Sequence, residues 1–126
     1  MKIIYGYLDG DNVGHRLELL LLDSLVDDAR AYSRAVEEAM AQVGKALQAK
    51  PDVDIVLTGG DDLLVRWPRG SLINQDFVNA CEVFKRVCGQ TASVGIGDSS
   101  RSAAQSLRRA KLMGKATIFA GCEDWE

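Results

Sequence analysis

Residues 55–65 read IVLTGGDDLLV, and this stretch decides how the rest of the chain is arranged. Apolar residues on both sides of a Gly-Gly-Asp-Asp segment are typical of two β-strands joined by a hairpin turn. Gly59 and Gly60 permit backbone angles that other residues avoid, and they let a bulky ligand come close. The sequence therefore predicts a β-hairpin with Asp61 and Asp62 at its turn.

The adjacent carboxylates of Asp61 and Asp62 have two interpretations. Glycine and aspartate are common turn residues, so the segment can be a simple polar hairpin tip. However, two carboxylates between buried strands repel each other and lose water, which costs free energy. A divalent cation would offset that cost, because hard cations prefer oxygen ligands. The hairpin alone leaves both interpretations open.

Composition indicates one globular domain without a broad binding surface for polyanions. The chain has 126 residues, of which 47% are hydrophobic and 26% are charged, as in ordinary folded domains. Its net charge is −3, so no overall field attracts nucleic acid or a membrane surface. We therefore expect that neither nucleic acid nor a membrane is a partner.

The sequence also predicts a cytoplasmic location. No stretch approaches the roughly 20 apolar residues that a membrane span needs, and the first residues do not resemble a secretory signal. Cys81, Cys88 and Cys122 form no Cys-x-x-Cys pair. Their odd number indicates reduced thiols rather than a disulfide framework.

The first strand is predicted at residues 2–8, and the segment DGDNVG follows at residues 9–14. Carboxylates at the carboxyl end of a buried strand, here Asp9 and Asp11, are candidates for a functional site. Alternatively, the segment is a polar strand-to-helix loop in which Asn12 or Asp11 caps the next helix.

A long helix is predicted next. Residues 25–47 carry apolar side chains at spacings of three and four, which indicates one face of a helix that ends near Ala49. A leucine-rich turn at residues 15–22 precedes it, and the helix can restart at residues 23–24. His15 is the only histidine in the chain, and one histidine cannot build a metal cluster. We expect it at the surface or at a helix cap.

The remainder of the chain continues to alternate strands and helices. The predicted elements are hairpin strands at 53–58 and 63–66, a helix that ends at Gly89, a strand at 91–96, a helix that begins near Ser99 or Ser100 and ends at Gly114, and a short strand at 117–119. The first six elements form a βαββαβ unit. We therefore predict an α+β, ferredoxin-like fold with an antiparallel sheet and helices packed on one face. One domain covers residues 1–120, and the acidic tail at 121–126 is expected to be loose.

This topology moves the distant carboxylates to one edge of the sheet. In a βαββαβ unit the first strand and the second hairpin strand are antiparallel neighbours, so Asp9 should meet Asp61 and Asp62. Three such carboxylates can hold one or two Mg²⁺ or Mn²⁺ ions, which can activate a ribose hydroxyl and stabilise a leaving pyrophosphate. This geometry favours a functional site over a polar hairpin tip.

Two lysines add a possible phosphate contact. Lys111 and Lys115 lie four residues apart, which would place them on one helix face. There they could neutralise a triphosphate as point charges. Alternatively, they are ordinary surface lysines at a helix carboxyl end, where the helix dipole favours cations.

Four ordered segments resemble the palm domain shared by GGDEF nucleotide cyclases and the polymerase-like large subunit of type III CRISPR complexes. They are DGDNVG at 9–14, GGDD at 59–62, TASVGIG at 91–97, and Ala110-Lys111 together with Lys115. The chain holds a palm without further domains, so it most resembles the stand-alone minimal CRISPR polymerases (mCpol). That family is associated with antiphage defence and with making cyclic oligonucleotides from nucleoside triphosphates.

The resemblance implies a role for each matching residue. Asp9, Asp61 and Asp62 would be metal ligands, with Asp11 a possible further one, and Asp61 and Asp62 would be the catalytic pair. The predicted nucleotide-binding residues are Gly10, Asn12, Gly59, Gly60, Lys111 and Lys115.

The chain departs from the GGDEF pattern at two points. Asp62-Leu63 replaces Glu-Phe, and Asn12 lies too early to match the asparagine with which GGDEF cyclases read guanine. By analogy with the CRISPR branch, we therefore expect a homodimeric, Mg²⁺-dependent nucleotidyltransferase that makes a cyclic dinucleotide or cyclic oligoadenylate from ATP. A separate protein would respond to the product. The alternatives are a GGDEF-type diguanylate cyclase that uses GTP and a non-catalytic nucleotide-binding sensor.

Overall fold

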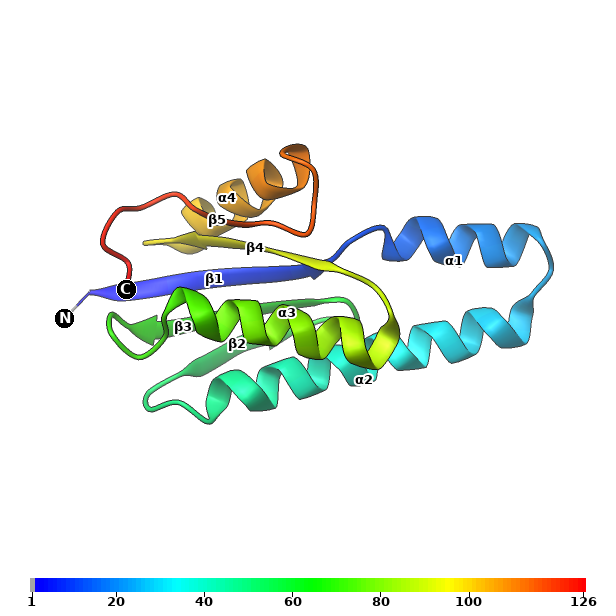
Figure 1. The fold of residues 1–126 in the computed structure, drawn as a ribbon, viewed down its shortest axis with the longest axis horizontal. Helices are drawn as coiled ribbons and strands as arrows, with labels where there is room; N and C mark the ends of the chain where they lie inside the picture. Colours follow the sequence, from blue (N-terminus) through cyan, green and yellow to red (C-terminus); the bar gives the residue numbers. More distant parts are fainter. Residues whose placement is uncertain (1) are drawn as a thin grey trace.

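The computed structural model describes residues 2–126 and contains five strands and four helices (Figure 1). In chain order they are β1 (Ile3–Gly10), α1 (Val13–Leu22), α2 (Val26–Gln48), β2 (Asp54–Thr58), β3 (Asp62–Pro68), α3 (Asn74–Cys88), β4 (Ala92–Gly97), α4 (Ser100–Leu112) and β5 (Ile118–Ala120). The predicted order of elements and the α+β palm-like fold are confirmed.

The five strands form one sheet in the order β2-β3-β1-β4-β5. β1 lies in the middle and pairs antiparallel with both β3 and β4. β5 departs from the expected antiparallel sheet, because it pairs parallel with β4. The reason is the connection: α4 carries the chain back across the sheet before β5, and such a crossover returns the next strand in the same direction.

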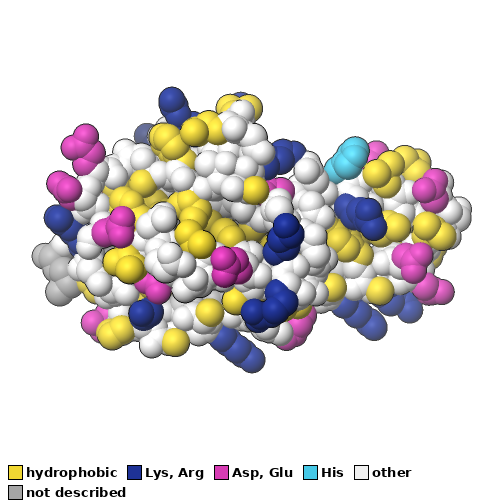
Figure 2. All heavy atoms as spheres, viewed as in Figure 1, with side chains coloured by type: hydrophobic (Ala, Val, Ile, Leu, Met, Phe, Trp, Pro, Cys, Tyr) yellow, Lys and Arg dark blue, Asp and Glu magenta, His cyan; other side chains and the backbone are white. Residues whose placement is uncertain are grey.

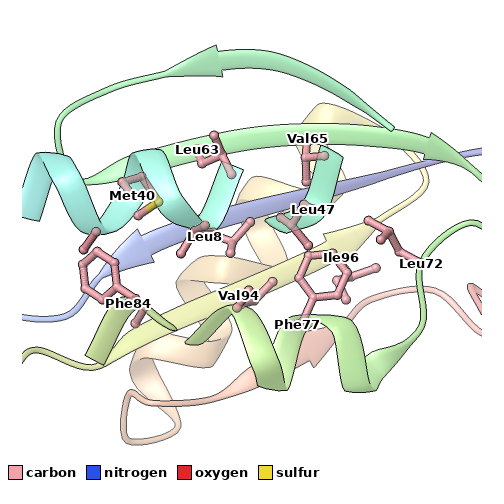
Figure 3. Packing of buried hydrophobic residues seen from close by; sticks show 14 of the residues in the cluster. Leu8, Met40, Leu47, Leu63, Val65, Leu72, Phe77, Phe84, Val94 and Ile96 are labelled. Atoms are coloured by element: carbon pink, nitrogen blue, oxygen red, sulfur yellow. The ribbon is translucent and has the colours of Figure 1, made fainter. Parts of the chain in front are cut away.

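The main core lies between the sheet and the helices α2 and α3. Met40 and Leu47 from α2 and Phe77 and Phe84 from α3 meet Leu8 of β1 in this layer (Figure 3). All five are buried. This part of the fold agrees with the prediction that helices cover one face.

α4 instead covers the opposite face of the sheet. Val94 and Ile96 of β4 belong to the main core, so Gly95 between them faces the other way. A Cβ atom on Gly95 would collide with the backbone of Ala103 and Leu107 in α4. The glycine thus lets the helix backbone rest directly on the strand, and the prediction of helices on one face holds only for α2 and α3.

The C-terminal tail is docked, so the expectation of a loose tail is wrong. Trp125 is only 7% exposed. Its ring centroid lies 6.2 Å from that of Trp67 and 5.9 Å from that of Phe77. The backbone N–H of Asn74 also donates to Glu126 Oε2 at 3.2 Å. A single large aromatic residue can anchor a short acidic segment in this way.

This docking predicts a large effect on stability. Trp125→Ala should lower the free energy of unfolding by about 3–5 kcal/mol, as expected for truncating a buried aromatic residue. Urea denaturation measures the difference, and Glu123→Gln is the control because Glu123 is an exposed residue of the same tail. A Trp125→Ala protein as stable as the wild type would show that the tail does not contribute to the core.

Helices α1 and α2 form a helical hairpin that projects beyond the sheet (Figure 1). They are separated by residues 23–25, as the predicted restart indicated. α1 begins after Asn12, whose left-handed backbone has a φ of 59° and whose side chain makes no capping hydrogen bond. Asn12 thus occupies the N-cap position, as one alternative interpretation of this segment expected, but its side chain does not cap the helix. Between residues 2 and 126, no helix is long and apolar enough to cross a bilayer.

Candidate metal centre

Three carboxylates meet at the end of the sheet from which the α1–α2 hairpin projects. The antiparallel register of β1 and β3 places Asp9 opposite Asp62, and the Gly10 N–H donates to the Asp61 carbonyl oxygen at 2.9 Å. One carboxylate oxygen from each of Asp9, Asp61 and Asp62 lies within 4.8 Å of the other two. The predicted convergence of these residues is confirmed.

The donor set of this cluster fits a hard divalent cation. Burial raises the pKa of Asp9 above its usual range, the charges of Asp61 and Asp62 add to the shift, and Lys111 opposes it. The rise shows that the charged form of Asp9 is disfavoured, mainly because the carboxylate is partly removed from water and to a smaller extent because Asp61 and Asp62 repel it. A cation bound by oxygen ligands relieves this repulsion, so Asp9, Asp61 and Asp62 are suited to hold Mg²⁺ or Mn²⁺.

The turn glycines serve the cluster in a way that the sequence did not predict. Neither Gly59 nor Gly60 has a positive φ, so the turn does not use the left-handed backbone angles that glycine permits. Gly59 instead provides space, because a Cβ atom there would collide with the Asp62 carboxylate in its present position. Gly60 has no such contact closer than 3.7 Å, to Glu37 of α2. Gly59 therefore allows the Asp62 side chain to fold back over the turn.

Lys111 reaches the cluster from α4, on the face of the sheet that α4 covers. Its Nζ atom lies 2.9 Å from Asp9 Oδ2 and 3.1 Å from Asp11 Oδ1, and it donates to the Gly10 carbonyl oxygen at 3.1 Å. Burial lowers the pKa of Lys111, but the two carboxylates outweigh burial and raise it overall. Lys111 is therefore a fixed positive charge beside the cluster.

Asp11 lies outside the three-carboxylate group. It is fully buried, and it accepts hydrogen bonds from Thr91 Oγ1 and Ser93 Oγ at 2.8 Å, from the Ala116 N–H at 2.9 Å, and from Lys111 Nζ at 3.1 Å. Burial raises the pKa of Asp11, but these donors outweigh it and lower the pKa overall. Its oxygens are thus occupied by protein donors, which suits a residue that positions Lys111 better than a metal ligand.

Lys115 does not share a helix face with Lys111. α4 ends at Leu112, and Lys115 lies in the following loop with a left-handed φ of 63°. Its Nζ atom nevertheless contacts Asn12 Oδ1. The two lysines therefore approach the loop after β1 from two different segments, and the shared helix face was a wrong prediction.

Sequence reasoning missed three side chains that support the site. The Tyr7 hydroxyl donates to Asp62 Oδ2 at 3.1 Å. Burial raises the pKa of Tyr7, and its hydrogen bond to Asp62 adds to the rise. Tyr7 lies two residues before Asp9, so strand alternation places both on one face and could have identified it. Thr91 and Ser93 have the same two-residue spacing on the β4 side.

A pocket lies next to Asp61, between the projecting helices and the hairpin turn. Its volume is about 210 Å³, and its lining includes Val13 and Leu17 from α1, Ser33 and Glu37 from α2, and Gly60. Apolar walls with a few polar groups are typical of small-molecule sites. No sequence pattern predicts this pocket, because its walls come from separate segments.

A ferredoxin-like sheet with acidic residues at the adjoining ends of β1 and β3 defines the palm class of domains found in nucleotide cyclases and polymerases. Residues 5–120 match mCpol, the minimal CRISPR polymerase domain. The chain therefore belongs to the mCpol family. No curated protein matches its sequence.

Solved structures confirm the fold. A Csm1–Csm4 cassette in complex with cA4 has 20% identity and a TM-score of 0.79 over 96% of this chain, and one in complex with one ATP has 20% identity and a TM-score of 0.77 over 93%. The chain spans 21% and 20% of those two chains, respectively. The active GGEEF domain of a diguanylate cyclase from Vibrio cholerae has 13% identity and a TM-score of 0.60, covering 98% of this chain and 85% of that one.

Proposed function

We propose that this protein is a cytoplasmic, divalent-metal-dependent nucleotidyltransferase that converts ATP into a cyclic dinucleotide or cyclic oligoadenylate and releases pyrophosphate. The cluster of Asp9, Asp61 and Asp62 at an open edge of a palm is the observation that carries this proposal. Membership of the mCpol family supports it. By the same resemblance, the product is a second messenger in antiphage defence that a separate effector protein binds.

The reaction requires a ribose hydroxyl oxygen of one nucleotide to attack the α-phosphorus of another. A new O–P bond forms, the bond between that phosphorus and the oxygen that bridges to the β-phosphate breaks, and the hydroxyl proton passes to solvent water. Metal held by the cluster would polarise the hydroxyl and stabilise the leaving pyrophosphate. Asp9, Asp61 and Asp62 would hold that metal, and the Tyr7 hydroxyl fixes the orientation of Asp62 through its hydrogen bond.

The lysines beside the cluster are suited to receive the phosphates. Lys111 and Lys115 both reach the loop after β1, where they contribute positive charge beside the carboxylates. A triphosphate bound at this edge would bring its negatively charged oxygens to Lys111. Metal bound by the cluster would then neutralise the charge of Asp9 in place of Lys111. Gly10 lets Val13 and Phe84 pack directly against the end of β1, because a Cβ atom there would collide with both side chains.

Lys111→Ala should weaken ATP binding and leave adenosine binding unchanged. Loss of a charge-assisted contact to phosphate costs on the order of 1.5–3 kcal/mol. Calorimetry with both ligands in the presence of Mg²⁺ measures the difference. Lys45→Ala is a matched control, because Lys45 is an exposed lysine of α2 outside the site. An equal loss for ATP and adenosine would show that Lys111 does not contact phosphate.

The pocket beside Asp61 is suited to the nucleobase. Its apolar walls can stack against a base, and Glu37 can accept a hydrogen bond from the exocyclic amine of adenine. ATP is favoured because a Csm1–Csm4 structure of the same fold is in complex with one ATP. A carboxylate can also accept two N–H groups from guanine, and this observation keeps a GTP-dependent cyclase as the second candidate.

One experiment separates these candidates. The protein is incubated with labelled ATP or GTP and Mg²⁺, and the products are identified by mass. A cyclic adenylate supports the proposal, and a cyclic guanylate supports the second candidate. Nucleotide binding without any product would instead assign the protein to the non-catalytic sensors.

Synthesis should proceed without nucleic acid. The net charge of −3 provides no broad surface for RNA. We therefore expect the initial rate of product formation to be the same after nuclease treatment and after addition of RNA. Negligible basal activity that RNA stimulates would contradict this expectation.

A further inference from the structure

The face of the sheet that carries α4 is only partly covered. Ile4 of β1 belongs to the main core, so strand alternation places Tyr5 and Tyr7 on the opposite face. Leu64 of β3 pairs with Tyr7, and Leu57 of β2 pairs with Leu64, so all four side chains share this face. Leu57 is 50% exposed, and the two tyrosines are half-buried. We call the surface formed by Tyr5, Tyr7, Leu57 and Leu64 the tyrosine face.

The tyrosine face leads directly into the carboxylate cluster. The register sets Tyr7 against Leu64 and, two residues further along β1, Asp9 against Asp62. The Tyr7 hydroxyl donates to Asp62 Oδ2 at 3.1 Å, so the ring leans along the strand toward the cluster. The ring therefore lies along the sheet, and its outer face can receive a planar group.

Positive charges lie at both ends of the tyrosine row. At the cluster end, Lys111 Nζ is 2.9 Å from Asp9 Oδ2. At the other end, the exposed Arg66 is opposite Tyr5 in the register and donates to Asp54 Oδ2 at 2.8 Å. Both side chains of this ion pair are about half exposed, and such surface pairs contribute little and can open. A ligand with planar groups and negative charges therefore complements this surface.

We propose that the tyrosine face binds the bases of a short single-stranded adenylate, namely the linear intermediate of the proposed reaction. This inference rests on the proposed function. Proteins that bind single strands stack successive bases on aromatic side chains. Tyr5 and Tyr7 are two residues apart and hence about 7 Å apart along the strand, which is about twice the rise between stacked bases. Each ring thus takes one base that is splayed away from its neighbour.

The reaction requires the linear intermediate to stay bound between its two steps. The first attack forms one O–P bond and releases one pyrophosphate, which leaves a linear dinucleotide with one triphosphate and one free ribose hydroxyl. The second attack closes the ring and releases the second pyrophosphate. An intermediate that dissociates after the first step becomes a linear product. Stacking on the tyrosine face, next to Asp9 and Asp62, keeps the intermediate at the cluster until the ring closes.

A second apolar surface lies beside α3, where Figure 2 shows exposed hydrophobic side chains. Val78, Cys81 and Ile118 help to line a hollow of about 250 Å³ there. The residues that line it, all between positions 78 and 118, include no aromatic ring, and α3 covers the face of the sheet opposite to the tyrosines. A base that extends from the cluster therefore finds its stacking partners on the tyrosine face rather than in this hollow.

Binding of the dinucleotide adenylyl-adenosine (ApA) in excess chelator tests the surface without catalysis. ApA has two adenines and no triphosphate, so its binding needs neither metal nor turnover. In an NMR titration the dissociation constant for Tyr5→Leu should be at least about tenfold higher than for the wild type, because leucine keeps the apolar contact but loses the stacking. Tyr5→Phe is the matched control, because it keeps the ring and should bind ApA like the wild type.

A second variant tests the same surface without touching a ring. Leu57→Glu places a negative charge on the tyrosine face at a residue that is 50% exposed, so the fold should tolerate it, and it should weaken ApA binding by repelling the phosphodiester. Ile73→Glu is its control, because Ile73 is 46% exposed and precedes α3 on the other side of the sheet. A wild-type protein that does not bind ApA, or binding that neither Tyr5→Leu nor Leu57→Glu weakens, would overturn the proposal.

The products made from ATP and Mg²⁺ identify the ligand. Tyr5→Leu should raise the ratio of linear to cyclic product at least about tenfold, because the intermediate dissociates before closure, and Tyr5→Phe should restore the wild-type ratio. Weaker ApA binding with an unchanged ratio would assign the face to an external single strand and overturn its assignment to the intermediate. ApA binding that depends on Tyr5 in a protein that makes no product would refute the proposed function alone. Cyclic product together with ApA binding that does not depend on Tyr5 would refute this inference alone.

Discussion

Asp61→Asn abolishes cyclic product formation and leaves the fold intact: this is the largest effect that we expect. The variant removes one of three carboxylates that meet within 4.8 Å. Metal-mediated stabilisation of charge contributes several kcal/mol to such reactions, so the rate should fall at least about a hundredfold. Asp9→Asn should have the same effect, because Asp9, which comes from the neighbouring strand β1, belongs to the same group of carboxylates.

Thermal unfolding with and without Mg²⁺ distinguishes a loss of catalysis from a loss of the folded structure. A ligand that binds only the folded state stabilises it, so Mg²⁺ should raise the melting temperature of the wild type and not that of Asp61→Asn. Without metal the variant should be at least as stable as the wild type, because a repulsive charge is gone.

The control for this experiment is Asp52→Asn. Asp52 is exposed, away from the cluster, and has a φ of 61° that asparagine tolerates. It should match the wild type in activity and in the response to Mg²⁺. Product formation in excess chelator, or normal turnover by Asp61→Asn, would show that the cluster is not the catalytic centre.

The meeting of Asp9 with Asp61 and Asp62 could be predicted because sheet pairing is a long-range constraint that the sequence pattern reveals. Once the βαββαβ order is recognised, β1 must lie beside β3 in an antiparallel register. The end of one strand then meets the start of the other. This prediction requires only the positions of the hairpin and of the first strand in the sequence, and strong apolar patterns mark both elements.

Other features could not be predicted because they depend on how side chains fill space. Asp11 looked like a ligand beside Asp9, but four donors from distant segments enclose it. Lys115 lies four residues after Lys111, which is the spacing of one helix face, but α4 ends at Leu112, before it reaches Lys115. Trp125 lay in an acidic tail, and only the fold shows that Trp67 and Phe77 receive it.

The second large effect concerns assembly: the specific activity should rise with protein concentration. Closing a cyclic dinucleotide takes two attacks, each with its reacting atoms held about 3–3.5 Å apart. Residues 2–126 contain one group of three carboxylates, which in the proposed function would serve one triphosphate. We expect two copies to present their nucleotides to each other across the edges that carry Gly59 to Asp62 and the loop from Gly10 to Gly14.

Mixing experiments test this requirement independently of concentration. A tenfold excess of Asp61→Asn chains should lower the activity per wild-type chain roughly tenfold, because by mass action most wild-type chains then pair with an inactive partner. Activity per chain that stays constant above and below the dimer dissociation constant would contradict the requirement, because a single palm would then complete both attacks by itself.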